Sequence, residues 1–331
     1  MIDFSGKLVL APLAGVSDSN YRLICRRLGA DITWSEMVSA DGLVYSWEKN
    51  RFLLEFNDEE RPLGIQLFGS EPEIMGQAAA AVARLGPDFI DLNFGCPVKK
   101  VVRRNGGASL MRSPDLIGRI TEMVVKNSGE VPVTAKIRSG WSDKELNYLQ
   151  VGRILVEAGA RAVCIHARTR GQAFSGSSRW EHIANLAREL PVPVIGSGDI
   201  FEPQDALRMF EQTGCAAVMI GRGIMGNPWL FQRTRCVLDG RPDPGAPVAR
   251  QRLALALEHA RMTVAQRGEP HGVVFMRKHF ASYTRGLLAG AALRQRLFRA
   301  ENLEQVENLF ENYLEESEST LQGSSINEGE E

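Results

Sequence analysis

Short apolar runs alternate with longer amphipathic segments along most of the chain. Eight runs are nearly continuous in Val, Ile, Leu or Ala, as strands buried on both faces should be. These runs cover residues 7–12, 31–37, 63–69, 89–95, 133–140, 162–169, 192–200 and 216–223. Segments with helical periodicity separate them, at residues 18–28, 71–85, 114–127, 143–157, 180–189, 203–212 and 225–238. Eight β-α units in about 240 residues predict an α/β fold, a (β/α)8 TIM barrel, rather than a doubly wound sheet.

Several predicted helices begin with residues that favour a helix start. Ser17, Ser70 and Ser113 each precede a helical segment, where a hydroxyl can accept a hydrogen bond from a backbone N–H of the first turn. Pro114 occupies the first helical position of its segment, where a missing N–H is tolerated. These residues set the expected starts of three helices.

The pattern changes after the eighth unit. Residues 239–247 (DGRPDPGAP) are rich in Pro, Gly and Asp and predict a linker. Residues 248–316 have helical periodicity without a strand-like run, which predicts a small all-α domain. Residues 317–331 are polar and acidic and are expected to be disordered. We therefore expect a barrel domain over 1–240, followed by the helical domain and the acidic tail.

Charge is distributed unevenly along the 331 residues, although the net charge is only −1. Residues 250–299 contain ten Arg and Lys but two Glu, whereas residues 300–331 contain ten Glu and no basic residue. A basic segment beside a nearly neutral body indicates a polyanionic partner. A solvated helical face is the alternative reading of the same charges.

Composition places the chain among soluble globular proteins. The hydrophobic fraction of 44% allows a sizeable core, and no apolar run reaches the roughly 18 residues that a membrane helix needs. The N-terminal residues lack the basic start and long apolar stretch of a signal peptide, so we expect a cytoplasmic protein without a membrane segment. The five cysteines are widely spaced and form no CxxC pair, so neither a metal site nor a disulfide framework is indicated.

Polar residues interrupt the apolar runs at their C-terminal ends, where (β/α)8 barrels place their functional residues. They are the stretch from Asn93 to Cys96, Lys136, Arg138, His166, Arg168, the stretch GSGD at 196–199 and the stretch GRG at 221–223, and Gln66 lies within the third run. A lysine inside the apolar stretch VTAKIRSG is costly to bury unless an anion meets it. Taken singly, Lys136 fits a strand-end lysine whose ammonium group reaches solvent, or one that pairs with a carboxylate, and His166 fits a core histidine. Together, these residues indicate one site on the rim of the barrel.

Two glycine-rich strand ends indicate where a phosphate would bind. The seventh run ends in GSGD and the eighth in GRG, and both sequences expose backbone N–H groups. Loops at these positions commonly hold phosphate in such barrels, and Arg222 can add a charge-assisted bond. No GxGxxG sequence follows the first strand, so a Rossmann dinucleotide site is not supported. A phosphate here, with Lys136 and Gln66 under a ring system, indicates FMN.

Seven sequence blocks follow one another in an order that is informative as a set. They are APLAGVSD at 11–18, SEM at 35–37, DLNFGCP at 91–97, KIR at 136–138, HART at 166–169, GD at 198–199 and GRG at 221–223. In this order they resemble the bacterial tRNA-dihydrouridine synthases, most closely the B-type branch. The likeness covers residues 8 to about 232 and continues more weakly through the helical part. The N-x-G-C-P block followed by Lys99, Lys100 and Val101 is the most specific, whereas several flavin barrels share the other blocks.

The resemblance implies an enzyme that uses FMN and NADPH to reduce the C5=C6 bond of particular uridines in tRNA. The residues expected to hold FMN are Pro12, Leu13, Ala14, Gln66, Lys136, His166, Ser197, Gly198, Asp199, Gly221 and Arg222. Many relatives have asparagine where this chain has Ser197, but serine still offers a hydroxyl and a backbone N–H. In the implied reaction a hydride passes from flavin N5 to C6 of uracil, and Cys96 donates the proton to C5.

Cys96 has the properties that a general acid for this reaction needs. Protonation at C5 requires an acid on the face of uracil opposite the flavin. A thiol has a reference pKa of about 8.5, so it is mostly protonated at neutral pH and needs no base to prepare it. Gly95 allows close approach and Pro97 stiffens the turn, which favours a thiol fixed on the rim over a merely structural cysteine.

Substrate contacts are expected around this thiol and in the basic helical segment. The candidates are Asn93, Lys99, Arg138, Arg168, Arg277 and Lys278, with Arg294, Arg296 and Arg299 as further phosphate contacts. The sequence does not separate the roles of Arg138, His166 and Arg168, which can orient the base or its phosphate. A uridine in folded RNA must be splayed out to reach the rim, so the protein needs a second RNA-binding surface besides the cavity. Because the last three arginines cannot share one helix face, we expect two helices to form the basic patch that binds the RNA.

Two other functions fit part of the sequence. A flavin barrel acting on a small molecule, such as an enone or a pyrimidine, would share the FMN site but would have little use for the basic segment. A non-catalytic tRNA-binding protein or chaperone would use the basic segment but would not need Cys96, Lys136 and His166 together. We therefore expect a tRNA-dihydrouridine synthase that acts as a monomer, with tRNA and NADPH as its partners.

Overall fold

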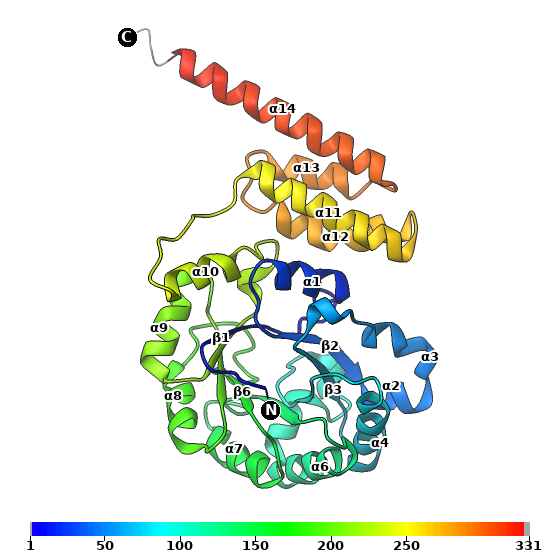
Figure 1. Ribbon diagram of the computed structural model, residues 1–331, viewed down its shortest axis with the longest axis vertical. Helices are drawn as coiled ribbons and strands as arrows, with labels where there is room; N and C mark the ends of the chain where they lie inside the picture. Colours follow the sequence, from blue (N-terminus) through cyan, green and yellow to red (C-terminus); the bar gives the residue numbers. More distant parts are fainter. Residues whose placement is uncertain (1, 328–331) are drawn as a thin grey trace. The chain divides into compact units, whose positions relative to one another are not determined.

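A computed structural model describes residues 2–327 of the chain, and these residues form two compact units. Within the described residues, the barrel unit consists of 2–223 and Leu230–Asp243, and the helical unit of Ile224–Trp229 and 244–327. Figure 1 shows the strands of the barrel unit inside a ring of helices. The prediction placed residues 224–229 in the barrel. They belong to the helical unit because Gly226 packs so closely on Ser282 that a Cβ on it would lie 2.3 Å from the Ser282 carbonyl carbon.

Eight parallel strands form one sheet with the order β1-β8-β7-β6-β5-β4-β3-β2. They are β1 (Lys7–Leu10), β2 (Thr33–Ser39), β3 (Leu63–Phe68), β4 (Phe89–Asn93), β5 (Val133–Arg138), β6 (Val163–His166), β7 (Val194–Ser197) and β8 (Ala217–Ile220). Val9 bridges to Ile32, immediately before β2, and this contact joins the two ends of the sheet. The predicted (β/α)8 barrel is confirmed. The doubly wound alternative is wrong, because such a sheet stays open.

Most strands end earlier than the apolar runs that predicted them. The seventh run extends to residue 200, for example, whereas β7 ends at Ser197. Gly198 and Asp199 have φ angles of 125° and 58°, which are incompatible with an extended strand. The residues that follow each strand therefore form rim loops, and many of the polar residues predicted for a site lie in or next to them.

Ten helices of the described chain belong to the barrel unit. They are α1 (Ser19–Arg27), α2 (Ala40–Tyr45), α3 (Trp47–Asn50), α4 (Pro72–Ala83), α5 (Lys99–Val102), α6 (Pro114–Asn127), α7 (Tyr148–Glu157), α8 (Trp180–Glu189), α9 (Pro203–Thr213) and α10 (Leu230–Leu238). The sequence did not predict α2, α3 and α5. These helices have six, four and four residues, too few to show a helical period.

The predicted serine caps differ from the observed helix starts. Asp18 caps α1 and accepts a hydrogen bond from Tyr21 N–H at 3.0 Å, whereas the Ser17 hydroxyl accepts from Leu13 N–H within the preceding turn. Ser113 stands at the N-cap of α6 but makes no side-chain cap bond. A carboxylate is the stronger acceptor for a backbone N–H, so Asp18 rather than the serine before it begins the helix.

Large apolar side chains fill the barrel interior near the N-terminal ends of the strands. The rings of Phe4, Trp34 and Phe89 meet there, with Trp34 and Phe89 packed edge to face at a centroid distance of 4.6 Å. Gly64 on β3 leaves the space that the Phe89 ring occupies, since a Cβ on it would lie 2.0 Å from that ring. This packing closes one end of the barrel, so a ligand can enter only at the other.

Polar residues succeed this apolar layer toward the C-terminal ends of the strands. Strand register pairs Gln66 with Asp91 and Asp91 with Thr134. Two residues further along, Asn93 pairs with Lys136, and two residues beyond that His166 pairs with both Arg138 and Ser197. Side chains two residues apart on a strand point to the same face, so these polar groups gather at one end of the interior.

The helical unit contains four long helices, α11 (Ala249–Arg267), α12 (His271–Tyr283), α13 (Gly290–Leu297) and α14 (Leu303–Asn327). α11 packs against α12 and α14, and α13 contacts α12 and α14. The rings of Phe280 and Phe310 meet edge to face in its core at 5.9 Å. The predicted all-α part is confirmed. The predicted disordered tail overlaps the end of α14, and its last four residues, 328–331, lie outside the described part of the chain.

The basic residues expected to bind RNA lie on α12, on α13 and just after α13. Arg277 and Lys278 belong to α12, Arg294 and Arg296 belong to α13, and Arg299 follows the end of α13, so the expected patch draws on two helices and its contact with RNA stays a prediction. Because α13 ends at Leu297, helical periodicity does not determine the direction of the Arg299 side chain. Arg296 and Arg299 are exposed, while Arg294 donates to the backbone oxygen of Thr284 at 3.0 Å.

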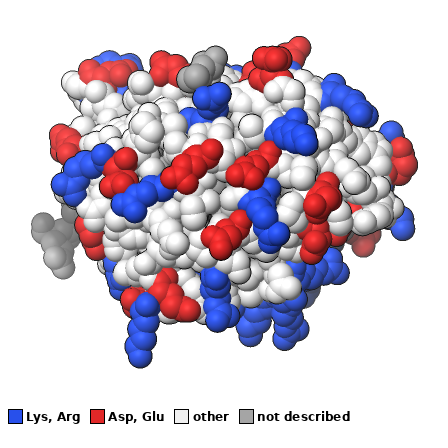
Figure 2. Space-filling view, turned by 90° about the horizontal axis from the view of Figure 1, so that it is seen from below, with Lys and Arg blue, Asp and Glu red and all other residues white. Residues whose placement is uncertain are grey.

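Charged side chains of both signs are interspersed over the face of the molecule that Figure 2 shows. Ion pairs at the surface of the barrel unit include Arg153 with Glu189 at 2.6 Å and Arg208 with Asp205. Among the described helices, none is both long enough and apolar enough to span a bilayer.

Candidate active site

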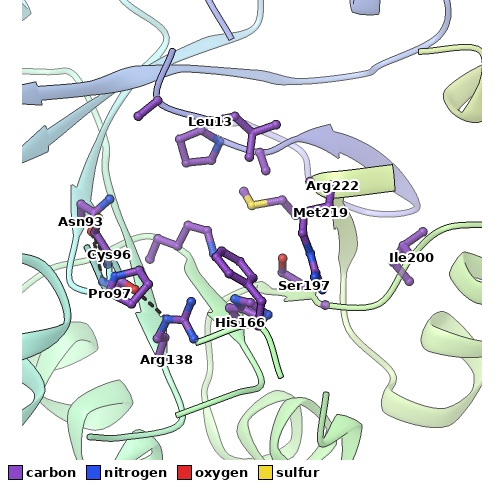
Figure 3. A pocket seen from close by; sticks show the side chains of 18 of the residues that line it. Leu13, Asn93, Cys96, Pro97, Arg138, His166, Ser197, Ile200, Met219 and Arg222 are labelled. Carbon is purple, nitrogen blue, oxygen red and sulfur yellow. Dashed lines mark hydrogen bonds between the residues drawn. The ribbon is translucent and has the colours of Figure 1, made fainter. Parts of the chain in front are cut away.

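A cavity of about 310 Å³ opens at the C-terminal ends of the strands. Figure 3 shows Asn93, Cys96 and Pro97 on one side of it and Ser197, Ile200 and Arg222 on another. Thirteen of the predicted site residues line this cavity: Pro12, Leu13, Ala14, Asn93, Cys96, Lys136, Arg138, His166, Ser197, Gly198, Asp199, Gly221 and Arg222. The cavity thus brings together residues as distant in the sequence as Pro12 and Arg222. This agrees with the prediction that the strand ends form one site on the rim.

Five predicted residues do not line the cavity. Gln66 is fully buried in the barrel wall, and Arg168 is buried behind the rim, where it bonds to Asp199 at 2.7 Å. Lys99 is exposed at the start of α5, next to the lining residue Val98. The other two, Arg277 and Lys278, lie on α12 of the helical unit.

The turn that carries Cys96 is held by three groups of hydrogen bonds. The Asn93 side-chain oxygen accepts from the backbone N–H groups of Gly95 and Cys96 at 3.1 and 2.9 Å. The Arg138 guanidinium donates to the Gly95 carbonyl at 2.7 Å, and Ala108 N–H donates to the Cys96 carbonyl at 3.0 Å. The thiol is thus presented by a turn whose backbone is anchored on both sides.

The environment of Cys96 favours its protonated form. Partial burial raises the pKa of the thiol, and this effect outweighs the opposing effects of a backbone hydrogen bond at Val98 and the charge of Arg138. A thiol with a raised pKa stays protonated at neutral pH. It is therefore prepared to give a proton rather than to attack as a thiolate.

Positive charge dominates the lining of the cavity. Lys136, Arg138 and Arg222 line it, and Asp199 is the only carboxylate among the lining residues. Burial lowers the pKa of Arg138 to about 10, with the nearby arginines adding to the shift. A guanidinium with that pKa still carries its charge at neutral pH. The cavity therefore favours an anionic ligand.

His166 is a neutral imidazole at this cavity. Burial lowers its pKa well below the ordinary value, and the charges of Lys136, Arg138, Arg168 and Arg222 act in the same direction. The Arg168 Nη1 atom lies 3.4 Å from its Nε2. A neutral ring that accepts at Nε2 keeps an N–H donor at Nδ1, so His166 can offer a hydrogen bond without a charge.

The loop after β7 is shaped around Asp199. Burial acts to raise the pKa of Asp199, but hydrogen bonds from Arg168 and Ser178 N–H and the charges of Arg168 and Arg222 hold it below the ordinary value. Its carboxylate accepts from Arg168 at 2.7 Å and from Arg222 at 3.3 Å. Asp199 thus neutralises part of the local charge and orients both arginines. Gly198 must be glycine here, because a Cβ on it would lie 2.3 Å from the Ser178 hydroxyl.

Sequence reasoning missed several lining residues, of which two are exposed aromatics. Phe174 is 51% exposed, and the guanidinium carbons of Arg222 and Arg138 lie 4.8 and 5.6 Å from its ring centroid. Phe201 is 44% exposed and also meets Arg222, at 5.4 Å. Phe201 follows the end of β7 by four residues, and Phe174 follows the end of β6 by eight. An aromatic residue in a polar rim loop was the signal that could have identified them.

The lining also fits a phosphate-bearing flavin. The volume lies within the range of about 300–1,000 Å³ that is usual for ligand cavities. The glycine-rich ends of β7 and β8 line the cavity beside Arg222, and loops of this kind suit a phosphate. Among the described residues no carboxylate forms an ion pair with Lys136, which suits an anionic edge of a ring system.

Comparison with known proteins agrees with this geometry. The profile of the family described as "Dihydrouridine synthase (Dus)" matches residues 9–318. A "Probable tRNA-dihydrouridine synthase" of Mycobacterium tuberculosis (strain CDC 1551 / Oshkosh) is 37% identical over 94% of this chain and 82% of its own length. The "tRNA-dihydrouridine synthase B" of Pseudomonas aeruginosa is 38% identical over 89% of this chain and 87% of its own length.

A likeness to a solved structure supports the fold of the barrel unit. Histamine dehydrogenase from Rhizobium sp. 4-9 superposes with a TM-score of 0.54 at 13% identity, over 71% of this chain and 46% of that longer chain. At this identity the likeness concerns the fold alone. The match to the family profile over most of the sequence and the identity to these relatives establish that the chain belongs to the dihydrouridine synthase family.

Proposed function

We propose that this protein reduces particular uridines of tRNA to 5,6-dihydrouridine, with FMN as bound cofactor and NADPH as reductant. The family match and the names of the relatives support tRNA as the substrate. The observation that supports the chemistry most is the position of the Cys96 thiol, which lines the same cavity as the cationic loops after β7 and β8. A proton donor and an anion-binding end therefore share one cavity.

The cofactor would lie between the strand ends that line the cavity. Ser197, Gly198, Gly221 and Arg222 would hold its phosphate, and Lys136 would lie beside the ring system. When bound, FMN supplies the hydride that reduces uracil. Pro12, Leu13 and Ala14 would form a wall of the site. A direct contact from Gln66 to the flavin stays a prediction, since its side chain is buried in the wall.

Cys96 would deliver the proton that completes the reduction. Addition of hydride at C6 of uracil leaves negative charge that C5 relieves by taking a proton, and a positioned acid accelerates this transfer. The anchored turn fixes the thiol at the cavity surface, and partial burial keeps it protonated. The neutral His166 and the charged Arg138 would bind polar groups of the nucleotide.

The rate of tRNA-dependent flavin reoxidation is expected to fall at alkaline pH, with a midpoint above the ordinary thiol pKa. The acid form of Cys96 is present below its pKa and is lost as pH rises through it. Because burial raises this pKa, the loss moves to higher pH. Stopped-flow reoxidation of the reduced protein over a pH series measures the profile, and flavin reduction by NADPH at each pH is the control. A midpoint at or below the ordinary thiol value contradicts this assignment.

Neutralising Arg294, Arg296 and Arg299 to glutamine is expected to weaken tRNA binding and to flatten its salt dependence. Each phosphate contact that is lost lowers the slope of log K against log salt by about 0.7 to 0.9. Filter binding at four salt concentrations measures both quantities. The matched control neutralises Arg153, Arg188 and Arg208, three exposed arginines of α7, α8 and α9 in the barrel unit. Equal slopes for the two triple variants would move the RNA contact elsewhere.

An anaerobic titration tests the proposed function as a whole. The purified protein is reduced with NADPH, then mixed with tRNA transcribed without modifications, and the return of the oxidised flavin spectrum is followed. Prompt reoxidation by tRNA, and none by orotate or a simple enone, is the expected result. Reoxidation by the small molecules instead would support a reductase of small molecules. Bound flavin that no tRNA reoxidises, including tRNA from cells that lack this protein, would reject the proposal.

A further inference from the structure

Asp91 is a buried carboxylate to which the proposed reaction gives no role. It lies on β4 two residues before Asn93, and its side chain has no exposed surface. Burial raises its pKa, although hydrogen bonds from Gln66 and Thr134 act against the shift. A carboxylate in the middle of a barrel wall is costly without such bonds, so its partners show what it does there.

A directed series of hydrogen bonds leads from Asp91 to Cys96. Thr134 Oγ1 and Gln66 Nε2 donate to the two carboxylate oxygens of Asp91 at 2.6 and 2.7 Å. Asn93 Nδ2 donates to Gln66 Oε1 at 2.7 Å. The oxygen of the same Asn93 amide then accepts from the backbone N–H groups of Gly95 and Cys96 at 3.1 and 2.9 Å. Each side chain in the series is at most 7% exposed.

The carboxylate sets the direction of the bonds that join Asp91, Gln66 and Asn93. An ionised carboxylate only accepts hydrogen bonds, so Gln66 must turn its NH2 group toward Asp91 and its oxygen toward Asn93. Asn93 must then turn its own NH2 group toward Gln66, which leaves its oxygen facing the Cys96 turn. With the opposite orientation, the Asn93 NH2 group would face two backbone donors and the turn would lose its anchor. One acceptor-only group therefore orients two amides.

We propose that Asp91 is a positioning residue which, through Gln66 and Asn93, fixes the turn that presents the Cys96 thiol. The part of this inference that concerns catalysis rests on the proposed function. The part that concerns the turn does not, because it follows from bonds within the barrel wall. Asp91 would stabilise the rim from one layer below the cavity, since it is fully buried and is not among the residues that line the cavity.

Asp91→Asn tests the proposal because an amide at this position has nearly the same shape but no longer enforces one orientation. Cys96 is expected to react with iodoacetamide at least about threefold faster, since a loosened turn exposes the thiol. Mass spectrometry of the alkylated peptides follows Cys96 and uses the partly exposed Cys236 on α10 as internal reference. An unchanged ratio of the Cys96 and Cys236 rates would overturn the proposal.

Two further variants separate orientation from general loosening of the wall. Ser35→Ala removes a hydrogen bond to the Gln66 backbone N–H at 3.0 Å and leaves the amide series intact, so its Cys96 rate should equal that of the wild type. The double variant Asp91→Asn/Gln66→Glu moves the carboxylate from residue 91 to residue 66, the next member of the hydrogen-bond series. This carboxylate accepts from the Asn93 NH2 group, so Asn93 must again turn its oxygen toward Cys96. This variant should restore the wild-type Cys96 rate. Equal acceleration in all three variants would show that only wall stability matters.

The outcome also stays decisive if Asp91→Asn alone does not fold. A folded double variant with the wild-type Cys96 rate would then support the proposal, because the direction of the bonds would be restored without a carboxylate at 91. Failure of both variants to fold would overturn it. In folded Asp91→Asn, flavin reduction by NADPH should be unchanged and reoxidation by tRNA slower. Suppose that Cys96 is alkylated faster in Asp91→Asn, but tRNA does not reoxidise the flavin of the wild-type protein. This result would support the role of Asp91 and reject the proposed function.

Discussion

Replacing Cys96 by alanine is expected to remove nearly all tRNA-dependent reoxidation of the flavin. A positioned general acid contributes about 10²- to 10⁴-fold to a proton transfer, and alanine offers no proton. The hydrogen bonds that hold the turn use backbone atoms at this position, so the fold and the cavity should persist. Flavin content and the rate of reduction by NADPH should therefore equal those of the wild type. Stopped-flow measurement of the two half-reactions separates these effects.

Controls distinguish the acid role of Cys96 from its contribution to packing. Cys96→Ser keeps the size and polarity of the side chain but replaces the thiol by a much weaker acid, so its reoxidation should be nearly as slow as that of Cys96→Ala. Cys236→Ala removes a cysteine of similar exposure and should have no effect. Full activity in Cys96→Ala, or full activity restored by serine, would refute the assignment of Cys96 as acid.

Much of the barrel unit follows from the sequence because two of its signals are local. A strand buried on both faces is apolar throughout, so eight apolar runs can be counted without knowledge of tertiary structure. Functional residues of such barrels gather at the C-terminal strand ends, so Cys96, Lys136 and Arg222 could be assigned to one cavity although they are distant in the sequence. The family resemblance added the cofactor and the substrate to this picture.

The sequence does not reveal how polar side chains divide between the cavity and its wall. Gln66 and Asn93 are both amides on strands of the barrel, but Gln66 is enclosed by Asp91 and Asn93 and has no exposed surface. Arg168 and Arg222 both bond to Asp199, yet only Arg222 lines the cavity. These differences depend on strand register and on loop conformation, such as the left-handed φ of Asp199, which no local pattern encodes.

Replacing Lys136 by alanine or methionine is expected to weaken flavin retention by about 10- to 100-fold, which is the usual weight of one hydrogen bond to a charged group. Lys136 lies on β5 between Asn93 and Cys164 in the strand register and lines the cavity. Its charge would meet the anionic edge of the ring system, and this interaction gains strength where burial excludes water. Flavin fluorescence released during equilibrium dialysis measures the dissociation constant.

The two substitutions at Lys136 separate charge from packing. Methionine keeps most of the lysine stem and removes the ammonium group, so equal losses in both variants would assign the effect to the charge. A loss in Lys136→Ala alone would assign it to the volume of the stem, and no loss in either would place the flavin elsewhere in the cavity. Lys126→Ala, an exposed residue on α6, is the control for removal of a lysine. Lys136 lies on β5, and Cys96 follows the neighbouring strand β4, so both line the same cavity. Loss of flavin in the Lys136 variants and loss of proton transfer in the Cys96 variants would assign cofactor binding to Lys136 and the acid role to Cys96.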